Sequence, residues 1–176
     1  DGVFDALYSQ GVLHHTADTE TAFKQLAPSV KRGGHMAVWV YGKAGKWAQF
    51  KTNPLKPGRA GLEKMRFLVW LAVGLRQWLS DFSRVFTTRL PAPLVRAKCY
   101  GLAALGAVPG FKYLTYSVHP DFKVRMLENF DWLSPPYQFH HTKEELCRWY
   151  EDSGFKVEKI LPHGFVPKPG VLGRKL

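Results

Sequence analysis

Two pairs of adjacent histidines are the residues in this sequence that could most directly do chemistry. His14 and His15 follow a short apolar stretch near the start of the chain, and His140 and His141 precede an acidic run near its end. A neutral imidazole can act as a metal ligand or as a general base. Because adjacent side chains point in different directions and the first pair has no third ligand, we expect no metal site.

Tyr137 joins His140 and His141 as a candidate proton acceptor, since all three stand in one short polar and aromatic segment. Two interpretations stay open for these three residues. They could hydrogen-bond within a loop, or one of them could serve as the general base of a reaction.

The elements that must position these residues follow an α/β pattern at both ends of the chain. Residues 2–9 are short and mostly apolar, which favours a buried parallel strand, and residues 36–41 resemble a second one. Between them a helix should begin at Asp18 or Thr19 and stop at Gly33-Gly34. Pro28 should shorten or kink this helix.

The second α/β region begins with a helix whose start has a clear signature. Thr142 and Glu145 form the Thr-x-x-Glu pattern of a capping box, and Gly154 should end the helix. Residues 156–161 alternate as a strand, and residues 166–172, interrupted by Pro167 and Pro169, should lead to a short final strand.

The middle of the chain, residues 42–140, shows no alternation of strands and helices. A loop over 42–61 precedes three stretches with helical spacing, at 62–86, 94–107 and 113–133. The sequence therefore predicts a helical insert within an α/β domain.

Two separated motifs resemble class I S-adenosylmethionine-dependent methyltransferases. The first runs from Phe4 through Ser9-Gln-Gly-Val-Leu-His14 to Tyr41, and it is similar to the back half of the donor-binding domain. The second runs from Tyr137 to Phe155 and is similar to a late helix of bacterial members of the family. The motifs occur in the family's order on either side of the insert.

The resemblance implies the C-terminal half of a doubly wound, Rossmann-like methyltransferase sheet. Residues 1–41 and 141–176 would form this core, and residues 42–140 would form a helical insert that acts as a substrate lid. S-adenosylmethionine would be the methyl donor, and the acceptor a small or lipid-like molecule. Ligands bind such sheets beyond the carboxyl ends of the strands. The residues implied to line the methionine end of the donor are Ser9, Gln10, Gly11, Val12 and His14.

The family's first strand and Gly-rich loop do not precede Phe4, so we interpret the chain as a fragment whose partner is the N-terminal half of the same domain. By itself the chain should bind S-adenosylmethionine weakly or not at all, and it should be inactive. The raw apolar edge of the first strand should favour self-association.

Charge and cysteine content limit the alternatives. The net charge is +11, and residues 42–140 hold 15 Lys and Arg against 5 Asp and Glu, a net of +10. This basic insert leaves a second interpretation open, a noncatalytic module that binds an anionic membrane surface or nucleic acid. We expect no nucleic-acid partner, because no recognition motif is present. Two distant cysteines favour a reducing compartment, the cytoplasm.

Overall fold

In a computed structural model, the described part of the chain comprises residues 2–43, 66–109, 111, 115–117, 119–161 and 168–176. The chain divides into two compact units, one formed by residues 1–71 with 137–176 and the other by residues 72–136. Most of the loop predicted over 42–61 lies outside the described residues.

The first unit opens with a strand, a helix and a second strand. Strand β1 (Phe4–Gln10) leads through a 3-10 turn, η1 (Leu13–His15), to helix α1 (Thr19–Leu26). Asp18 caps the helix by accepting a hydrogen bond of 3.0 Å from the Thr21 N–H. Pro28 lies in a second 3-10 turn, η2 (Ala27–Ser29), so the helix is shortened as predicted.

The Gly33-Gly34 pair does not end a helix, and that prediction was wrong. Strand β2 (Val30–Trp39) begins three residues earlier and runs through both glycines. Its pairing with β1 shifts there, because Phe4 lies opposite Val30 whereas Ala6 lies opposite His35. Gly33 has a φ of +78°. The left-handed glycine therefore serves an irregularity in the strand, which is the other common use of this conformation.

The two late strands complete a mixed sheet in the order β1-β2-β4-β3. Strand β3 (Phe155–Ile160) pairs antiparallel with β4 (Gly170–Lys175), which pairs antiparallel with β2. The predicted segments thus share one sheet, which confirms the α/β fold class. However, β3 reaches β2 only through β4, so residues 156–161 do not lie directly beside 36–41.

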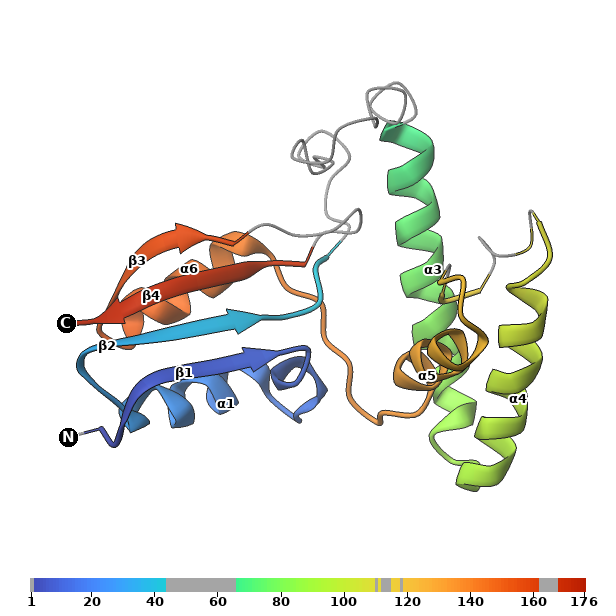
Figure 1. Cartoon of the computed structure of the whole chain (residues 1–176), viewed down its shortest axis with the longest axis horizontal. Helices are drawn as coiled ribbons and strands as arrows, with labels where there is room; N and C mark the ends of the chain where they lie inside the picture. Colours follow the sequence, from blue (N-terminus) through green and yellow to red (C-terminus); the bar gives the residue numbers. More distant parts are fainter. Residues whose placement is uncertain (1, 44–65, 110, 112–114, 118, 162–167) are drawn as a thin grey trace. The chain divides into compact units, whose positions relative to one another are not determined.

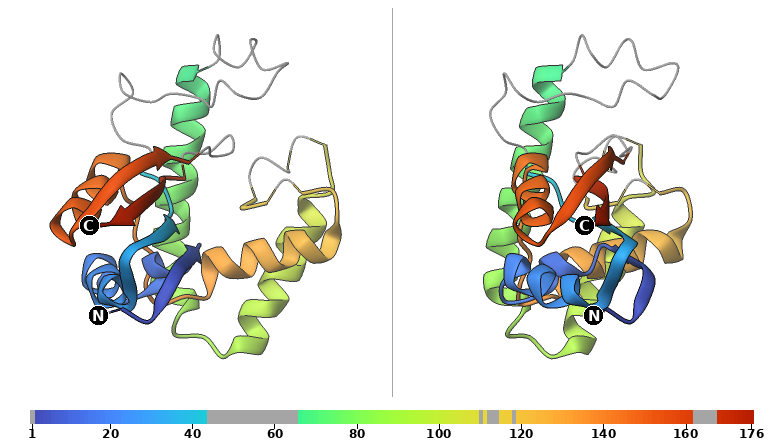
Figure 2. Two further views of the ribbon diagram at one scale, coloured as in Figure 1. Left: turned by 60° about the vertical axis from the view of Figure 1, so that its left-hand side comes forward. Right: turned by 90° about the vertical axis from the view of Figure 1, so that its left-hand side faces the viewer.

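Helices α1 and α6 (Lys143–Asp152) cover the same face of this sheet (Figures 1 and 2). Between the helices and the strands lies a core that includes Phe23, Met36, Leu146 and Tyr150, all with no exposed surface. The Tyr150 hydroxyl lies 3.0 Å from the Met36 carbonyl oxygen and 2.9 Å from that of Val171. One buried tyrosine thus joins α6 to both β2 and β4.

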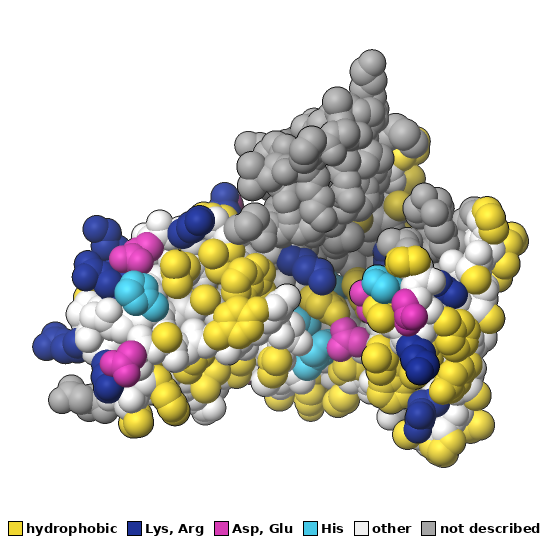
Figure 3. Space-filling view, in the orientation of Figure 1, with side chains coloured by type: hydrophobic (Ala, Val, Ile, Leu, Met, Phe, Trp, Pro, Cys, Tyr) yellow, Lys and Arg dark blue, Asp and Glu magenta, His cyan; other side chains and the backbone are white. Residues whose placement is uncertain are grey.

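The opposite face of the sheet is open in the described part of the chain. Apolar side chains gather on it (Figure 3), and Tyr8 is 62% exposed while it contacts the Trp39 ring edge-on. We predicted β1 as a buried strand, and most of its residues are instead exposed. The difference arises because β1 is an edge strand of the described sheet, and the helices cover only one face of that sheet.

The second unit consists mainly of helices. Helix α3 (Arg66–Thr87) begins in the first unit, and α4 (Ala92–Leu105) and α5 (Phe122–Leu133) follow it. A small core forms around Val95, Cys99, Tyr116 and Leu133. The helical character predicted for 62–86, 94–107 and 113–133 is thus found over 66–87, 92–105 and 122–133.

Helix α3 carries a row of large apolar side chains that are each at least half exposed: Phe67, Leu68, Leu71, Leu75, Trp78, Phe82, Val85 and Phe86. Trp78 stacks on Phe82 at a centroid distance of 5.7 Å. None of the helices in the described residues is long and apolar enough to cross a lipid bilayer.

Removing the hydroxyl of Tyr150 tests directly how its hydrogen bonds hold α6 to the sheet. Tyr150→Phe keeps the ring but leaves the two strand carbonyls without this donor. We expect the free energy of unfolding to fall by about 1 kcal/mol, the net value of a buried hydrogen bond. Urea denaturation measures the change. Tyr8→Phe is the matched control, because the exposed Tyr8 hydroxyl bonds, within the described residues, to the Gln10 side chain alone. Equal losses in both variants would contradict this role for Tyr150.

Candidate functional site

The loop that follows β1 lies beside the end of β2, since these two strands are parallel and in register up to Gln10 and Trp39. The Gly11 N–H donates to the Trp39 carbonyl oxygen at 3.1 Å, and Gly11 has a φ of +70°. A β-carbon at Gly11 would meet no atom of the described chain within 4 Å. The backbone here is thus open to close approach by a ligand.

The segment from Tyr137 to His141 binds across the carboxyl ends of both strands. The Phe139 N–H donates to the His14 carbonyl oxygen at 2.9 Å, and the His141 N–H donates to that of Tyr41 at 2.8 Å. Gly42 and His141 form a parallel bridge. Backbone hydrogen bonds therefore bring the two histidine pairs together, although more than 120 positions separate them in the sequence.

The aromatic rings in this region form a continuous cluster. His14 stacks on Tyr41 at 3.9 Å between centroids and lies 4.2 Å from His15, and Tyr41 stacks on His140 at 6.1 Å. The His15 Nδ1 lies 3.0 Å from the Tyr137 carbonyl oxygen. Sequence reasoning did not identify Tyr41, the centre of the cluster. Its place at the end of a strand and opposite the first histidine pair was the available signal.

His14 is a fully buried imidazole. Its Nδ1 accepts the Tyr41 N–H at 3.3 Å, so the neutral ring carries its proton on Nε2. Burial, and then repulsion from His15, His140, His141 and Lys168, lowers the pKa of His14 to about 3. His14 is therefore neutral throughout the physiological range.

The residues predicted to bind the donor lie at two different depths below the protein surface. Ser9, Gln10, Gly11 and Val12 reach the surface at the end of β1, and Val12 is 58% exposed. His14 lies beneath them, where it supports the loop and Tyr41. Their contact with a ligand stays a prediction.

The three candidate proton acceptors differ in their surroundings. The Tyr137 ring is 47% exposed and stacks on Phe139. His140 stacks on Tyr41. His141 is largely buried, and its Nδ1 lies 3.4 Å from Glu145 Oε2. The Glu145 carboxylate can orient the His141 ring.

Glu145 has a second role, the one that the sequence predicted. Its Oε2 accepts the Thr142 N–H at 2.9 Å, and its own N–H donates to the Thr142 hydroxyl at 3.1 Å, which confirms the capping box at the start of α6. Burial lowers the pKa of His141, and Glu145 opposes this shift. The sequence pattern indicated the cap but gave no sign of the contact with His141.

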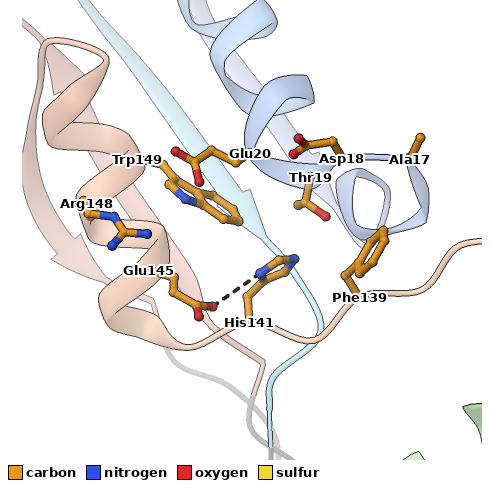
Figure 4. A pocket seen from close by; sticks show the side chains of 9 residues that line it. All are labelled: Ala17, Asp18, Thr19, Glu20, Phe139, His141, Glu145, Arg148 and Trp149. Carbon is orange, nitrogen blue, oxygen red and sulfur yellow. Dashed lines mark ion pairs between the residues drawn. The ribbon is translucent and has the colours of Figure 1, made fainter.

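His141 and Glu145 line a pocket of about 310 Å³ between the start of α1 and helix α6 (Figure 4). Phe139 and Trp149 form its aromatic wall, and Thr19 faces it from α1. Within the described residues, no group of three or more His, Cys, Asp or Glu side chains is arranged to hold a metal ion.

Residues 1–38 match the family model of a methyltransferase domain. The match covers β1, the loop with Gly11, α1 and nearly all of β2, and the cluster lies beyond the carboxyl ends of these two strands. Over this stretch the chain is similar to a methyltransferase domain. The resemblance stated from the sequence motifs is confirmed over these residues, and the partial mixed sheet agrees with it.

Burial of neutral His14 should make the fold sensitive to mild acid. An unfolded histidine binds a proton near pH 6.5, whereas native His14 does so only near pH 3. As the pH falls below 6.5, the unfolded state gains protons that the native state does not, so stability falls. We expect this group alone to lower the free energy of unfolding by roughly 2 kcal/mol between pH 7 and pH 5.

Urea denaturation at both pH values, with wild type and His14→Asn, measures this effect. The variant lacks the titrating ring, so its stability should fall by roughly 2 kcal/mol less than that of wild type over the same pH interval. An unchanged fall in the variant would show that His14 is not the group responsible.

Proposed function

We propose that the protein acts in methyl transfer from S-adenosylmethionine to a small-molecule or lipid-like acceptor. One observation carries the proposal. The segment that matches a methyltransferase domain ends its first strand in an open glycine loop, and this loop lies beside the candidate proton acceptors. Ligands of open α/β sheets bind at this edge.

The residues at the end of β1 suit the methionine end of the donor. Gly11 leaves free space where other residues carry a β-carbon, and Ser9, Gln10 and Val12 surround it at the surface. His14 would hold this loop from below through its stack on Tyr41. Bound S-adenosylmethionine would supply a methyl group already activated by its positive sulfur.

The protein's own task is then to orient the acceptor, exclude water and receive a proton. We assign the proton acceptor to His141. The Glu145 carboxylate, 3.4 Å from Nδ1, favours the tautomer with its proton there, which leaves the Nε2 lone pair for the acceptor. Burial holds the pKa of His141 below its usual value, so the ring is neutral and ready at pH 7.

Nuclear magnetic resonance can test the donor site even if binding is weak. Titration of the ¹⁵N-labelled chain with S-adenosylmethionine, to millimolar concentration, should shift the amide signals of residues 9–12. Methionine should shift the same signals less, and adenosine least. A side chain at Gly11 would block the approach, so Gly11→Ala should reduce the affinity at least tenfold.

Gly33→Ala is the matched control, because Gly33 has a similar φ of +78° and equally open space, but lies within β2 away from the loop. Both variants bear the same backbone strain. Only Gly11→Ala should lose the shifts. Equal losses in the two variants, or shifts outside residues 9–12, would contradict the proposed donor site.

The exposed face of α3 favours a second activity, association with an apolar or lipid-like surface. A helix with aromatic residues on one face and a basic chain around it can lie in a membrane interface. Trp78 and Phe82 are 60% and 54% exposed, respectively, and would lead the contact. This face could also contact a lipid-like acceptor, as the predicted role of substrate lid requires.

Vesicle flotation tests this association. We expect part of the protein to float with anionic vesicles, and Trp78→Ser with Phe82→Ser to abolish flotation. Leu127→Ser is the control, since Leu127 is 60% exposed on α5 of the same unit. Protein that stays wholly in solution would exclude a membrane partner and leave the methyltransferase proposal intact.

A further inference from the structure

Three residues that line the pocket beside His141 carry a buried polar atom with no hydrogen-bond partner in the described part of the chain. The Trp149 N–H is directed toward Glu20, and the other two atoms are the Thr19 hydroxyl oxygen and the His141 Nε2. Thr19 is only 3% exposed, and its hydroxyl points into the space between Phe139 and His141 (Figure 4). Buried polar groups nearly always have partners, so this pair indicates a ligand that supplies them.

The two atoms have opposite hydrogen-bonding roles. The Glu145 carboxylate favours a proton on the His141 Nδ1, so Nε2 is an acceptor, and the Thr19 hydroxyl can donate. A ligand hydroxyl group satisfies both, since its O–H donates to Nε2 and its oxygen accepts from Thr19. An ammonium group can donate to both atoms but leaves the Thr19 proton without an acceptor, and a carboxylate has no proton for Nε2.

The charges around the pocket also disfavour an anion. Among the described residues, Asp18, Glu20 and Glu145 line it together with a single cation, Arg148. Lys24 pairs with Glu20 at 2.7 Å, so the carboxylates are partly balanced and the pocket is not a strong cation site either. A neutral ligand therefore has the lowest electrostatic cost of binding in this pocket.

The remaining wall is aromatic. Phe139 lies at one side of the pocket, and the largely buried Trp149 contacts His141 edge-on at 4.9 Å. Lys24 lowers the pKa of the Glu20 carboxyl, and the Trp149 N–H, which is directed toward Glu20 without reaching hydrogen-bond geometry, adds a smaller effect in the same direction. A ligand with a flat or apolar group can pack against this aromatic wall.

We propose that this pocket binds a neutral, hydroxyl-bearing small molecule, a phenol or alcohol, whose hydroxyl group bridges Thr19 and His141. That this molecule is the methyl acceptor, with oxygen as the accepting atom, rests on the proposed function. Binding in the pocket does not depend on it. Glu145 is a positioning residue, because it acts on the ligand only through His141.

Phenol is a suitable probe, with toluene and benzoate as its neutral and anionic relatives without an alcohol or phenol hydroxyl. Binding to the ¹⁵N-labelled 176-residue chain is measured without any methyl donor, from the Trp149 indole N–H signal, which Trp149→Phe identifies. Phenol should shift this signal at millimolar concentration. Toluene and benzoate should bind at least fivefold more weakly, since they cannot satisfy both polar atoms.

Thr19→Val and His141→Asn should each weaken phenol binding about fivefold, and Thr19→Ser should restore it. The controls make the same changes outside the pocket. Thr21→Val removes an exposed hydroxyl of α1, and His35→Asn removes a histidine that lies 3.3 Å from Glu158. Both controls should bind phenol like wild type.

Three results would overturn the proposal: no phenol-dependent shift, equal binding of phenol and toluene, or unchanged phenol binding in Thr19→Val and His141→Asn. The donor titration reports on the amides of residues 9–12 instead. Failure at that loop with success here would leave a hydroxyl-binding pocket without the methyltransferase role.

Discussion

The backbone hydrogen bonds that fix residues 137–141 across the ends of β1 and β2 are the constraint on which the site depends. They join His14 to Phe139 and Tyr41 to His141, and so connect the two α/β regions of the sequence. The same segment leads directly into the cap of α6, which places Glu145 beside His141. Without these hydrogen bonds, residues 137–141 would not hold the first histidine pair and helix α6 in a fixed arrangement.

The environment formed in this way keeps imidazoles neutral. His14 loses its proton because it is buried among other histidines and near Lys168, and burial acts on His141 in the same direction. A neutral ring costs little to bury and keeps one lone pair available. His14 uses that lone pair for the Tyr41 N–H, whereas the lone pair of His141 faces the pocket. The two neutral imidazoles therefore differ in role: His14 supports the loop, and His141 is the proposed proton acceptor.

The features that the sequence predicted well are local ones. The Thr142–Glu145 cap, the helix end at Gly154 and the shortening of α1 at Pro28 each depend on a few neighbouring residues. Gly33 was misinterpreted because a glycine with positive φ serves a helix end and a strand irregularity equally well.

What escaped prediction depends on contacts between distant segments. The insertion of β4 between β2 and β3 is fixed by packing such as that of Tyr150, whose ring lies against Gly173 with no room for a side chain there. Thr19 gave no local signal of a site, and the position of Tyr41 at a strand end was only a weak one, because both roles depend on contacts with residues 137–141. The sequence identified the histidine pairs as candidate functional residues, but it did not identify the residues that contact them.

The shared use of Glu145 has a consequence for how this chain can change over evolutionary time. A glutamine at this position would cap α6 almost as well, since the cap needs only an oxygen near the Thr142 N–H. It would not carry the charge that favours the proton on the His141 Nδ1. Selection for folding alone therefore permits drift between the two residues, whereas selection for the histidine permits only the acid. Among relatives of this chain, that one substitution would separate lineages that still use His141 from those that merely retain it.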